Sequence, residues 1–289
     1  DKVISLDEND VDAWSNKGNS LRNLGKHEEA ISCYDKVISL DENNVVFWNN
    51  KGLALHRLEK NEEAISCYDK AISIDENNAD AWNNKGNSLR NLEKNEEAIS
   101  CYDKAISIDE NDVVFWNNKG HALNYLRKFE EAVPCYDKAI SLDENHVDGW
   151  SNKGKLLNYF EKHEEAISCY DKVISLDEND VDAWSNKGLA LFLLQKFEEA
   201  VPCFDKVISL DENNVDAWHF KGLALRNLGK HEEEISCYNK VISLDENNVD
   251  AWHAKGDSLK NLGKYEEAIS CFDKAISIDE NHVDAWLDK

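Results

Sequence analysis

Residues 181–214 read VDAWSNKGLALFLLQKFEEAVPCFDKVISLDENN, and this stretch contains the pattern on which the fold depends. In its first part, apolar side chains such as Trp184 and Leu191 recur at helical spacing. In its second part, Phe204 and Val207 do the same. The stretch therefore predicts two amphipathic helices in succession.

The ends of these two helices are marked by their flanking residues. Three other repeats carry glycine at the position of Gln195, which releases the backbone from helical dihedral angles, so the first helix is predicted to end there. Glu198 and Glu199 suit the first turn of the second helix because carboxylates oppose the positive end of the helix dipole. The Asp-Glu-Asn segment from Asp211 then favours a turn, which completes a helical hairpin.

Small residues stand where the two helices of the hairpin meet. Gly188 and Ala200 permit an approach of about 8–10 Å between the helix axes. Glu234 occupies the position of Ala200 in one repeat. We expect its carboxylate to reach an edge of the hairpin, and we expect that repeat to be locally weaker.

The hairpin recurs with a period of 34 residues. Nine tryptophans follow this step from Trp14 to Trp286, and eight cysteines follow it from Cys33 to Cys271. Eight complete repeats then span residues 11–282, with partial repeats at 1–10 and 283–289, and the prediction is a single array over 1–289. Because the sequence opens inside a repeat and without methionine, a leader or further repeats are expected to be missing before it.

Composition limits the classes of partner. The net charge of -25 argues against nucleic acid, because phosphate binding requires a basic face. No apolar run approaches the roughly 20 residues needed to cross a bilayer, so no membrane span is predicted. The acidic charge is distributed evenly over the repeats, which is typical of a solvated outer surface.

The repeat resembles the tetratricopeptide repeat in its Trp184-x-x-x-Gly188-x-x-Leu191 pattern, followed by Glu-Glu-Ala, an aromatic residue and Asp-Glu-Asn. The match covers essentially the whole chain. It implies an all-α fold, a right-handed α-solenoid superhelix with the first helix of each hairpin on the concave side, and a role in protein–protein assembly. Two departures are lysine at Lys187, where the family often has leucine, and glutamate at Glu212, where it often has proline.

The residue types that carry chemistry follow the repeat and form no separate constellation. Successive cysteines stand one helical layer apart, about 10 Å, which exceeds the roughly 7 Å limit for bridged α-carbons, so they are predicted to be buried free thiols. This favours a reducing compartment and hence the cytoplasm. We predict no enzyme activity, no cofactor and no metal, although His219 and His253, in adjacent repeats, are a weak alternative for a metal.

Positions that differ between repeats are the candidates for binding, because packing accounts for the others. The sixth position carries asparagine in six successive repeats, and an amide offers both the donor and the acceptor that a peptide backbone requires: Asn16, Asn50, Asn84, Asn118, Asn152 and Asn186. This series is similar to the asparagine ladder of some tetratricopeptide superhelices. Hydrogen bonds to neighbouring helices or to water are the alternative interpretation.

A second candidate surface is apolar. The ninth, twelfth and thirteenth positions, and in one repeat the sixth, become apolar toward the C-terminal half, at Tyr125, Tyr159, Leu189, Phe192, Leu193, Phe220 and Leu223. Exposed side chains of this kind bind partners, and packing against the next repeat is the alternative. The family's carboxylate clamp is incomplete, because its lysine position carries serine or asparagine.

These observations predict a non-catalytic scaffold whose concave groove binds an extended protein or peptide segment of neutral to basic charge. A structural role is the alternative, in which copies self-associate end to end into a fibre or a longer superhelix.

Overall fold

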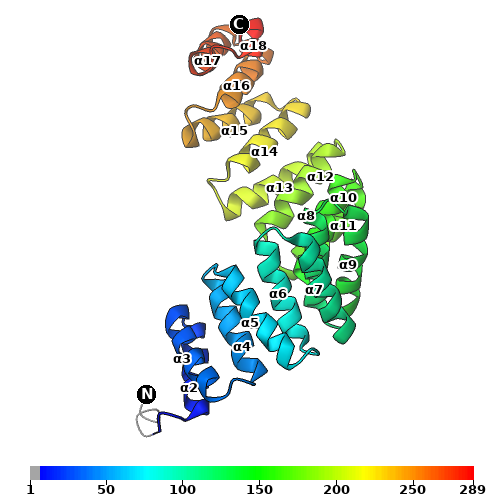
Figure 1. The fold of residues 1–289 in the computed structure, drawn as a ribbon. Helices are drawn as coiled ribbons and strands as arrows, with labels where there is room; N and C mark the ends of the chain where they lie inside the picture. The colour runs from blue at the N-terminus through cyan, green and yellow to red at the C-terminus, as the bar shows by residue number, and fades with distance from the viewer. Residues whose placement is uncertain (1–6) are drawn as a thin grey trace. The chain divides into compact units, whose positions relative to one another are not determined.

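The computed structural model describes residues 7–289, which are helical with no strand among them (Figure 1). The first six residues of the partial repeat predicted at 1–10 lie outside the described residues. The first helix of each repeat, here helix A, comprises in turn α2 (Val11–Asn23), α4 (Val45–Arg57), α6 (Ala79–Asn91), α8 (Val113–Tyr125), α10 (Val147–Tyr159), α12 (Val181–Leu193), α14 (Val215–Asn227), α16 (Val249–Asn261) and α18 (Val283–Asp288). The second, helix B, comprises α3 (His27–Leu40), α5 (Asn61–Ile74), α7 (Asn95–Ile108), α9 (Phe129–Leu142), α11 (His163–Leu176), α13 (Phe197–Leu210), α15 (His231–Leu244) and α17 (Tyr265–Ile278).

The chain divides into two compact units, Asp1–Gly149 (unit 1) and Trp150–Lys289 (unit 2). Within each unit, a B helix packs on the A helix of its own hairpin and on the A helix that follows. This arrangement is an all-α solenoid of helical hairpins, which confirms the fold class that the tetratricopeptide resemblance implies.

The helix ends agree with those predicted for residues 181–214. The side chain of Asp180 accepts a hydrogen bond from the backbone N–H of Ala183 (2.8 Å) and so caps α12. Gln195 has a φ of 60°, the left-handed conformation that ends this helix before α13 begins at Phe197.

Each hairpin is closed by an aromatic ring of helix B that packs against a glycine of helix A. In the third repeat, a Cβ atom added at Gly86 would lie 2.6 Å from Cε1 of Tyr102, whose side chain is fully buried. The predicted close approach at Gly188 has the same cause, because a Cβ there would lie 2.8 Å from Cε1 of Phe204. Glycine is therefore required by the space that the ring fills.

Consecutive hairpins are joined by a lysine that lies over the repeat's tryptophan. The Lys85 ammonium lies 5.7 Å from the Trp82 ring centroid and pairs with Asp69 of the preceding B helix (2.6 Å). The Trp82 indole N–H donates to the backbone oxygen of Glu76 in the turn before the helix (3.0 Å). The lysine that departs from the family pattern thus links two repeats.

None of the helices in the described part of the chain is long and apolar enough to cross a membrane.

We expect Gly86→Ala to destabilise unit 1. Alanine gains about 1 kcal/mol over glycine within a helix, but overpacking against a buried ring costs about 1–3 kcal/mol, so the net loss should be up to about 2 kcal/mol. Urea unfolding followed by circular dichroism measures this. The control is Gly229→Glu, at a turn position where other repeats carry Glu59 or Glu93 in the same conformation. An equal or smaller loss in Gly86→Ala than in the control would contradict the ring contact.

Candidate functional site

Within each unit, neighbouring A helices contact one another and form a surface, here called the A-helix face of that unit. In unit 1 these contacts join α2 to α4, α4 to α6 and α6 to α8. In unit 2 they join α12 to α14 and α16 to α18. Side chains that differ between repeats at the sixth, ninth, twelfth and thirteenth positions of helix A therefore lie close to those of the next A helix.

The asparagine series of unit 1 makes hydrogen bonds between neighbouring A helices. In three of the four repeats of unit 1, the sixth-position amide nitrogen donates to an asparagine oxygen on the preceding A helix: Asn50 to Asn19 (3.3 Å), Asn84 to Asn49 (3.1 Å) and Asn118 to Asn83 (2.9 Å). These bonds match the alternative interpretation, in which the asparagines bond to neighbouring helices. The side-chain oxygens of Asn84 and Asn118 accept no hydrogen bond from the described residues, so one edge of each amide is available to a ligand.

The remaining asparagines of the series lie in different surroundings. Asn16 is exposed on α2, and Asn152 on α10 is half-buried. The amide nitrogen of Asn186 donates to the backbone oxygen of Asp182 in its own helix (2.7 Å). The six asparagines are therefore not equivalent, although they occupy the same position of the repeat.

The apolar candidates also divide into exposed and packed side chains. Tyr125 of unit 1 is 63% exposed, and Tyr159 and Leu193 of unit 2 are 60% and 51% exposed. The ring of Phe192 packs edge-on against Phe197 of its own B helix, with centroids 5.3 Å apart. The other three apolar candidates, like Phe192, are half-buried: Leu189, Phe220 and Leu223.

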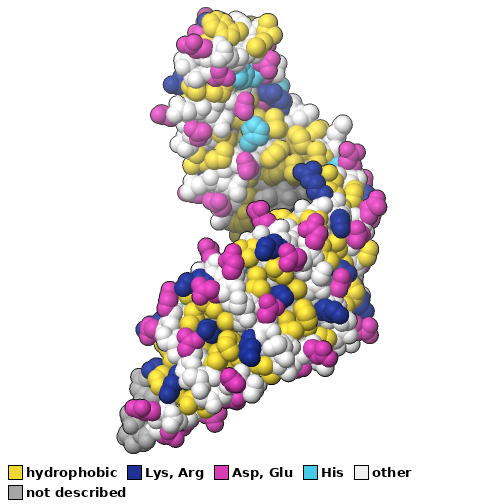
Figure 2. Space-filling view, viewed as in Figure 1, with side chains coloured by type: hydrophobic (Ala, Val, Ile, Leu, Met, Phe, Trp, Pro, Cys, Tyr) yellow, Lys and Arg dark blue, Asp and Glu magenta, His cyan; other side chains and the backbone are white. Residues whose placement is uncertain are grey.

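Phe220 extends this aromatic packing to the next A helix. Its ring centroid lies 6.0 Å from that of Phe192 and 5.9 Å from that of Phe204, on which it stacks. Figure 2 shows hydrophobic side chains gathered over α12 and α14. Among the apolar candidates on α12 and α14, Leu193 has the most exposed side chain.

Three arginines of unit 1 on the A-helix face were missed by the sequence analysis. Arg22, Arg57 and Arg90 lie at the ends of α2, α4 and α6, and none forms an ion pair with any of residues 7–289. Because the acidic residues are distributed evenly over the repeats, the net charge gives no sign of a local group of arginines. Their recurrence near the end of helix A, one repeat apart, is the signal by which the sequence could have revealed them.

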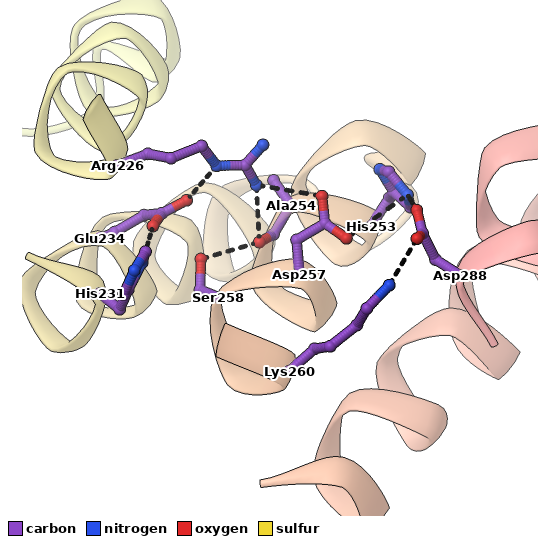
Figure 3. A network of polar contacts seen from close by, with 9 residues as sticks. All are labelled: Arg226, His231, Glu234, His253, Ala254, Asp257, Ser258, Lys260 and Asp288. Atoms are coloured by element: carbon purple, nitrogen blue, oxygen red, sulfur yellow. Dashed lines mark hydrogen bonds and ion pairs between the residues drawn. The ribbon is translucent and has the colours of Figure 1, made fainter. Parts of the chain in front are cut away.

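A buried carboxylate forms part of a polar network in unit 2 (Figure 3). Glu234 is fully buried, and it accepts a hydrogen bond from Nε of Arg226 (2.7 Å) while its other oxygen lies 3.2 Å from Nδ1 of His231. The expectation that this carboxylate reaches an edge was wrong, because Arg226 and His231 supply partners inside the hairpin. Nη2 of Arg226 also donates to the backbone oxygen of Ala254 (3.1 Å), which ties two repeats together.

A second charged group lies beside this one, around His253. Its Nε2 atom lies 3.0 Å from Asp288 and 3.9 Å from Asp257, and these three residues have ligand atoms close enough for a metal ion. Lys260 pairs with the other Asp288 oxygen (2.6 Å), and Arg226 lies 3.4 Å from Asp257. Because both carboxylates already have basic partners, the geometry favours an internal ion-pair network.

The carboxyl pKa values follow these contacts. Hydrogen bonds from Lys260 and then from His253 hold the pKa of Asp288 below its usual value, whereas burial raises the pKa of Asp257. His219 is not joined to His253 by any contact within residues 7–289, and its ring packs against Phe220 and Tyr238. The weak alternative of a metal shared by His219 and His253 therefore has no geometric support.

The eight cysteines are buried on the B helices, and all are free thiols. Burial raises the pKa of Cys101 to about 11, and the same holds for Cys67, Cys135, Cys203 and Cys237. A buried thiol with a raised pKa is a poor nucleophile and a poor metal ligand. The cysteines therefore serve packing, as small apolar side chains do.

Comparison with protein families identifies the repeat. Models described as tetratricopeptide repeat match residues 11–44, 79–112, 113–146 and 181–214, as well as 33–66, 215–248 and 249–282. A model described as TPR repeat matches residues 52–92 and 161–195. Together these segments cover most of the chain. A comparison with curated protein sequences gives no match.

Solved structures with this fold include repeat proteins from several sources. YrrB, described as a TPR protein with an unusual peptide-binding site, is 26% identical over 64% of this chain and 96% of its own, with a TM-score of 0.60. The C-terminal part of a TPR repeat-containing protein from Cytophaga hutchinsonii is 18% identical over 82% and 97%, with a TM-score of 0.71. MamA is 24% identical over 59% and 93%, with a TM-score of 0.57. The latter two show the fold alone.

Removing the two partners of the buried ion pair should have unequal effects. Arg226→Ala leaves the Glu234 carboxylate buried without its main partner and should destabilise unit 2 by about 3–5 kcal/mol. Glu234→Ala restores the alanine of the other repeats and should be much milder. Urea unfolding of both single variants and of the double variant measures this. A double variant no more stable than Arg226→Ala would contradict the proposed cause.

The cysteines should resist thiol reagents in the folded protein. With a pKa of about 11 for Cys101, the thiolate fraction at pH 8 is about 100-fold below that of an unperturbed thiol, and it rises only as the pH approaches 11. Labelling with iodoacetamide at pH 8, with and without urea, measures this. Equally fast labelling of the folded and the unfolded chain would show that the thiols are accessible.

Proposed function

Because this chain belongs to the tetratricopeptide repeat family, we propose that it is a protein-interaction scaffold that holds an extended segment of another protein on its A-helix face. In this proposal, residues 11–282 act as one array of eight repeats, flanked by the partial repeats 1–10 and 283–289. The function needs no cofactor or metal.

The observation that carries this proposal is the exposed apolar surface of unit 2. Leu193, the last residue of α12, leaves about half of its side chain uncovered, and it directly follows the half-buried Phe192 in the sequence. Single exposed leucines are ordinary, but one on the same helix as a cluster of partly exposed aromatic rings offers a partner's apolar side chain more than one contact. Phe192 and Phe220 are held by their mutual contact, so the surface is preorganised.

The charge around this surface sets the expected partner. Every A helix that lies wholly in unit 2 has an exposed aspartate at its second position: Asp182, Asp216, Asp250 and Asp284. These carboxylates disfavour an acidic segment and favour a neutral or basic one. An apolar segment with basic flanking residues is therefore the ligand proposed for unit 2.

The asparagine series supports backbone recognition in unit 1. The available oxygens of Asn84 and Asn118 accept hydrogen bonds of the kind that a peptide N–H donates. Repeats about 10 Å apart match about three residues of extended chain at about 3.3 Å each. YrrB, whose structure is described as having a peptide-binding site, adds support at 26% identity.

We expect Leu193→Asp to weaken the binding of an apolar peptide at least about tenfold, equivalent to about 1.4 kcal/mol, because a charge replaces the exposed leucine. The probe is a set of fluorescein-labelled twelve-residue peptides that carry leucine or phenylalanine at every third position with serine or lysine between. Fluorescence anisotropy measures the affinity.

The matched control is Leu210→Asp on α13. Leu210 is also a partly exposed leucine at the last position of its helix, so both variants place the same charge at a helix C-terminus. Equal weakening in both variants, or no binding of any peptide in the set, would contradict the proposal. Light scattering over a range of protein concentrations tests the alternative, since a mass that grows with concentration indicates end-to-end association.

A further inference from the structure

Three arginines on A helices of unit 1 have no acidic partner among residues 7–289, in a chain that has 58 acidic residues and 33 lysines and arginines. Only five of these basic residues are arginine, and these three are the majority of them. By contrast, the lysines at the seventh position of helix A, such as Lys51 and Lys85, have carboxylate partners 2.6 Å away. Arg22, Arg57 and Arg90 therefore lack acidic partners because of where they lie on the A helices, and not because carboxylates are scarce in the chain.

Arg22 and Arg57 line one recess of about 340 Å³ between α2 and α4. Asn23, His27 and Leu53 complete its lining, and none of these five residues is acidic. Nη1 of Arg22 donates to the side-chain oxygen of Asn50 (3.0 Å), which orients the guanidinium. The buried Nδ1 atom of His27 has no hydrogen-bond partner among residues 7–289.

A second recess of about 520 Å³ lies at the equivalent place two repeats further along, between α6 and α8. It is lined by Arg90, Asn91, Glu93, Asn95, His121 and Tyr125. Nη1 of Arg90 lies 3.2 Å from Nδ1 of His121, and the His121 ring packs edge-on against the exposed Tyr125 ring, with centroids 5.1 Å apart. Glu93 is the one acidic residue in this lining.

Asn95 points to the nature of the ligand in this recess. The side chain is only 8% exposed, and its Oδ1 atom has no hydrogen-bond partner in the described part of the chain. A buried acceptor without a partner costs about 1–3 kcal/mol, which a ligand N–H can offset. A ligand that satisfies both Asn95 and Arg90 must offer a hydrogen-bond donor and an anion close together.

We propose that the A-helix face of unit 1 binds an acidic polypeptide segment, whose carboxylate side chains pair with Arg22, Arg57 and Arg90 while its backbone N–H groups reach Asn95. This inference rests on the proposed function, because it assigns a ligand to the same face. A planar guanidinium pairs with a carboxylate through two parallel hydrogen bonds, which makes it selective for such groups.

The net charge of the chain does not oppose this proposal. Charges separated by more than about 10 Å are largely screened at physiological ionic strength, so the arginines lining a recess outweigh distant acidic residues. A polyanion such as nucleic acid would follow the surface over a longer path and meet the surrounding acidic groups. A short acidic segment avoids them. The partner of unit 1 thus differs from the neutral to basic partner that the net charge predicts.

The test uses a fluorescein-labelled twelve-residue peptide with glutamate at every third position and serine elsewhere, and its counterpart with glutamine in place of glutamate. We expect the glutamate peptide to bind at least about tenfold more tightly than the glutamine peptide. The triple variant Arg22→Gln, Arg57→Gln, Arg90→Gln should remove this difference. Fluorescence anisotropy at 50 and 150 mM salt measures both affinities, and circular dichroism checks the fold.

The control is Arg127→Gln, which makes the same kind of substitution once, in the turn between α8 and α9, and is compared with each single arginine variant as well as with the triple variant. Glutamine is accommodated there, because Gln195 occupies the equivalent turn position with a φ of 60° against 57° for Arg127. Equal loss in this control, or equal affinity for the glutamate and glutamine peptides, would overturn the proposal. Binding of a thymidine oligonucleotide as tight as that of the glutamate peptide would overturn it too, since the site would then accept any polyanion.

The apolar peptides separate this proposal from the proposed function. If they bind the triple variant normally and the glutamate peptide binds neither protein, the acidic-segment proposal fails while the scaffold stands. If the glutamate peptide binds as expected and Leu193→Asp leaves the apolar peptides unaffected, the unit 2 surface fails while the acidic site stands.

Discussion

The contact between a glycine of helix A and an aromatic ring of helix B is the constraint on which the rest of the structure depends. A ring such as that of Tyr102 is fully buried and occupies the space of a Cβ atom at Gly86, so the two helices pack at the closest distance that the side chain permits. Repetition of this contact gives hairpins of the same shape. Within each unit, the A helices then contact one another and form a common face.

The joints between hairpins use the remaining periodic residues. Trp82 bonds to the turn before its helix, and Lys85 lies over the ring while it pairs with Asp69 of the preceding repeat. Exposed ion pairs contribute little individually, but here the lysine also covers an aromatic surface. The tryptophans, lysines and cysteines therefore serve packing, so ligand binding falls to the residues that differ between repeats.

Those differing residues give the two units unlike surfaces. Unit 1 presents arginines without acidic partners, whereas unit 2 presents an exposed leucine beside packed aromatic rings. In unit 2 the equivalent arginine, Arg226, forms an ion pair with the buried Glu234. The same position of the repeat is therefore proposed to bind a ligand in unit 1, whereas it stabilises the core of unit 2. The difference arises because Glu234, the fourth residue of α15, replaces the alanine of the other repeats.

The period of 34, the helix ends and the close approach at Gly188 were determined by the sequence alone, because each depends on contacts within one hairpin. Hydrogen bonds across repeats were decided by the tertiary structure. The sequence showed that Asn84 recurs, but only the packing of α4 on α6 revealed that its N–H bonds to Asn49 and leaves its oxygen available. Likewise, the burial of Glu234 depends on Arg226, eight residues away on another helix, because a carboxylate enters a core only where a cation and hydrogen bonds meet it.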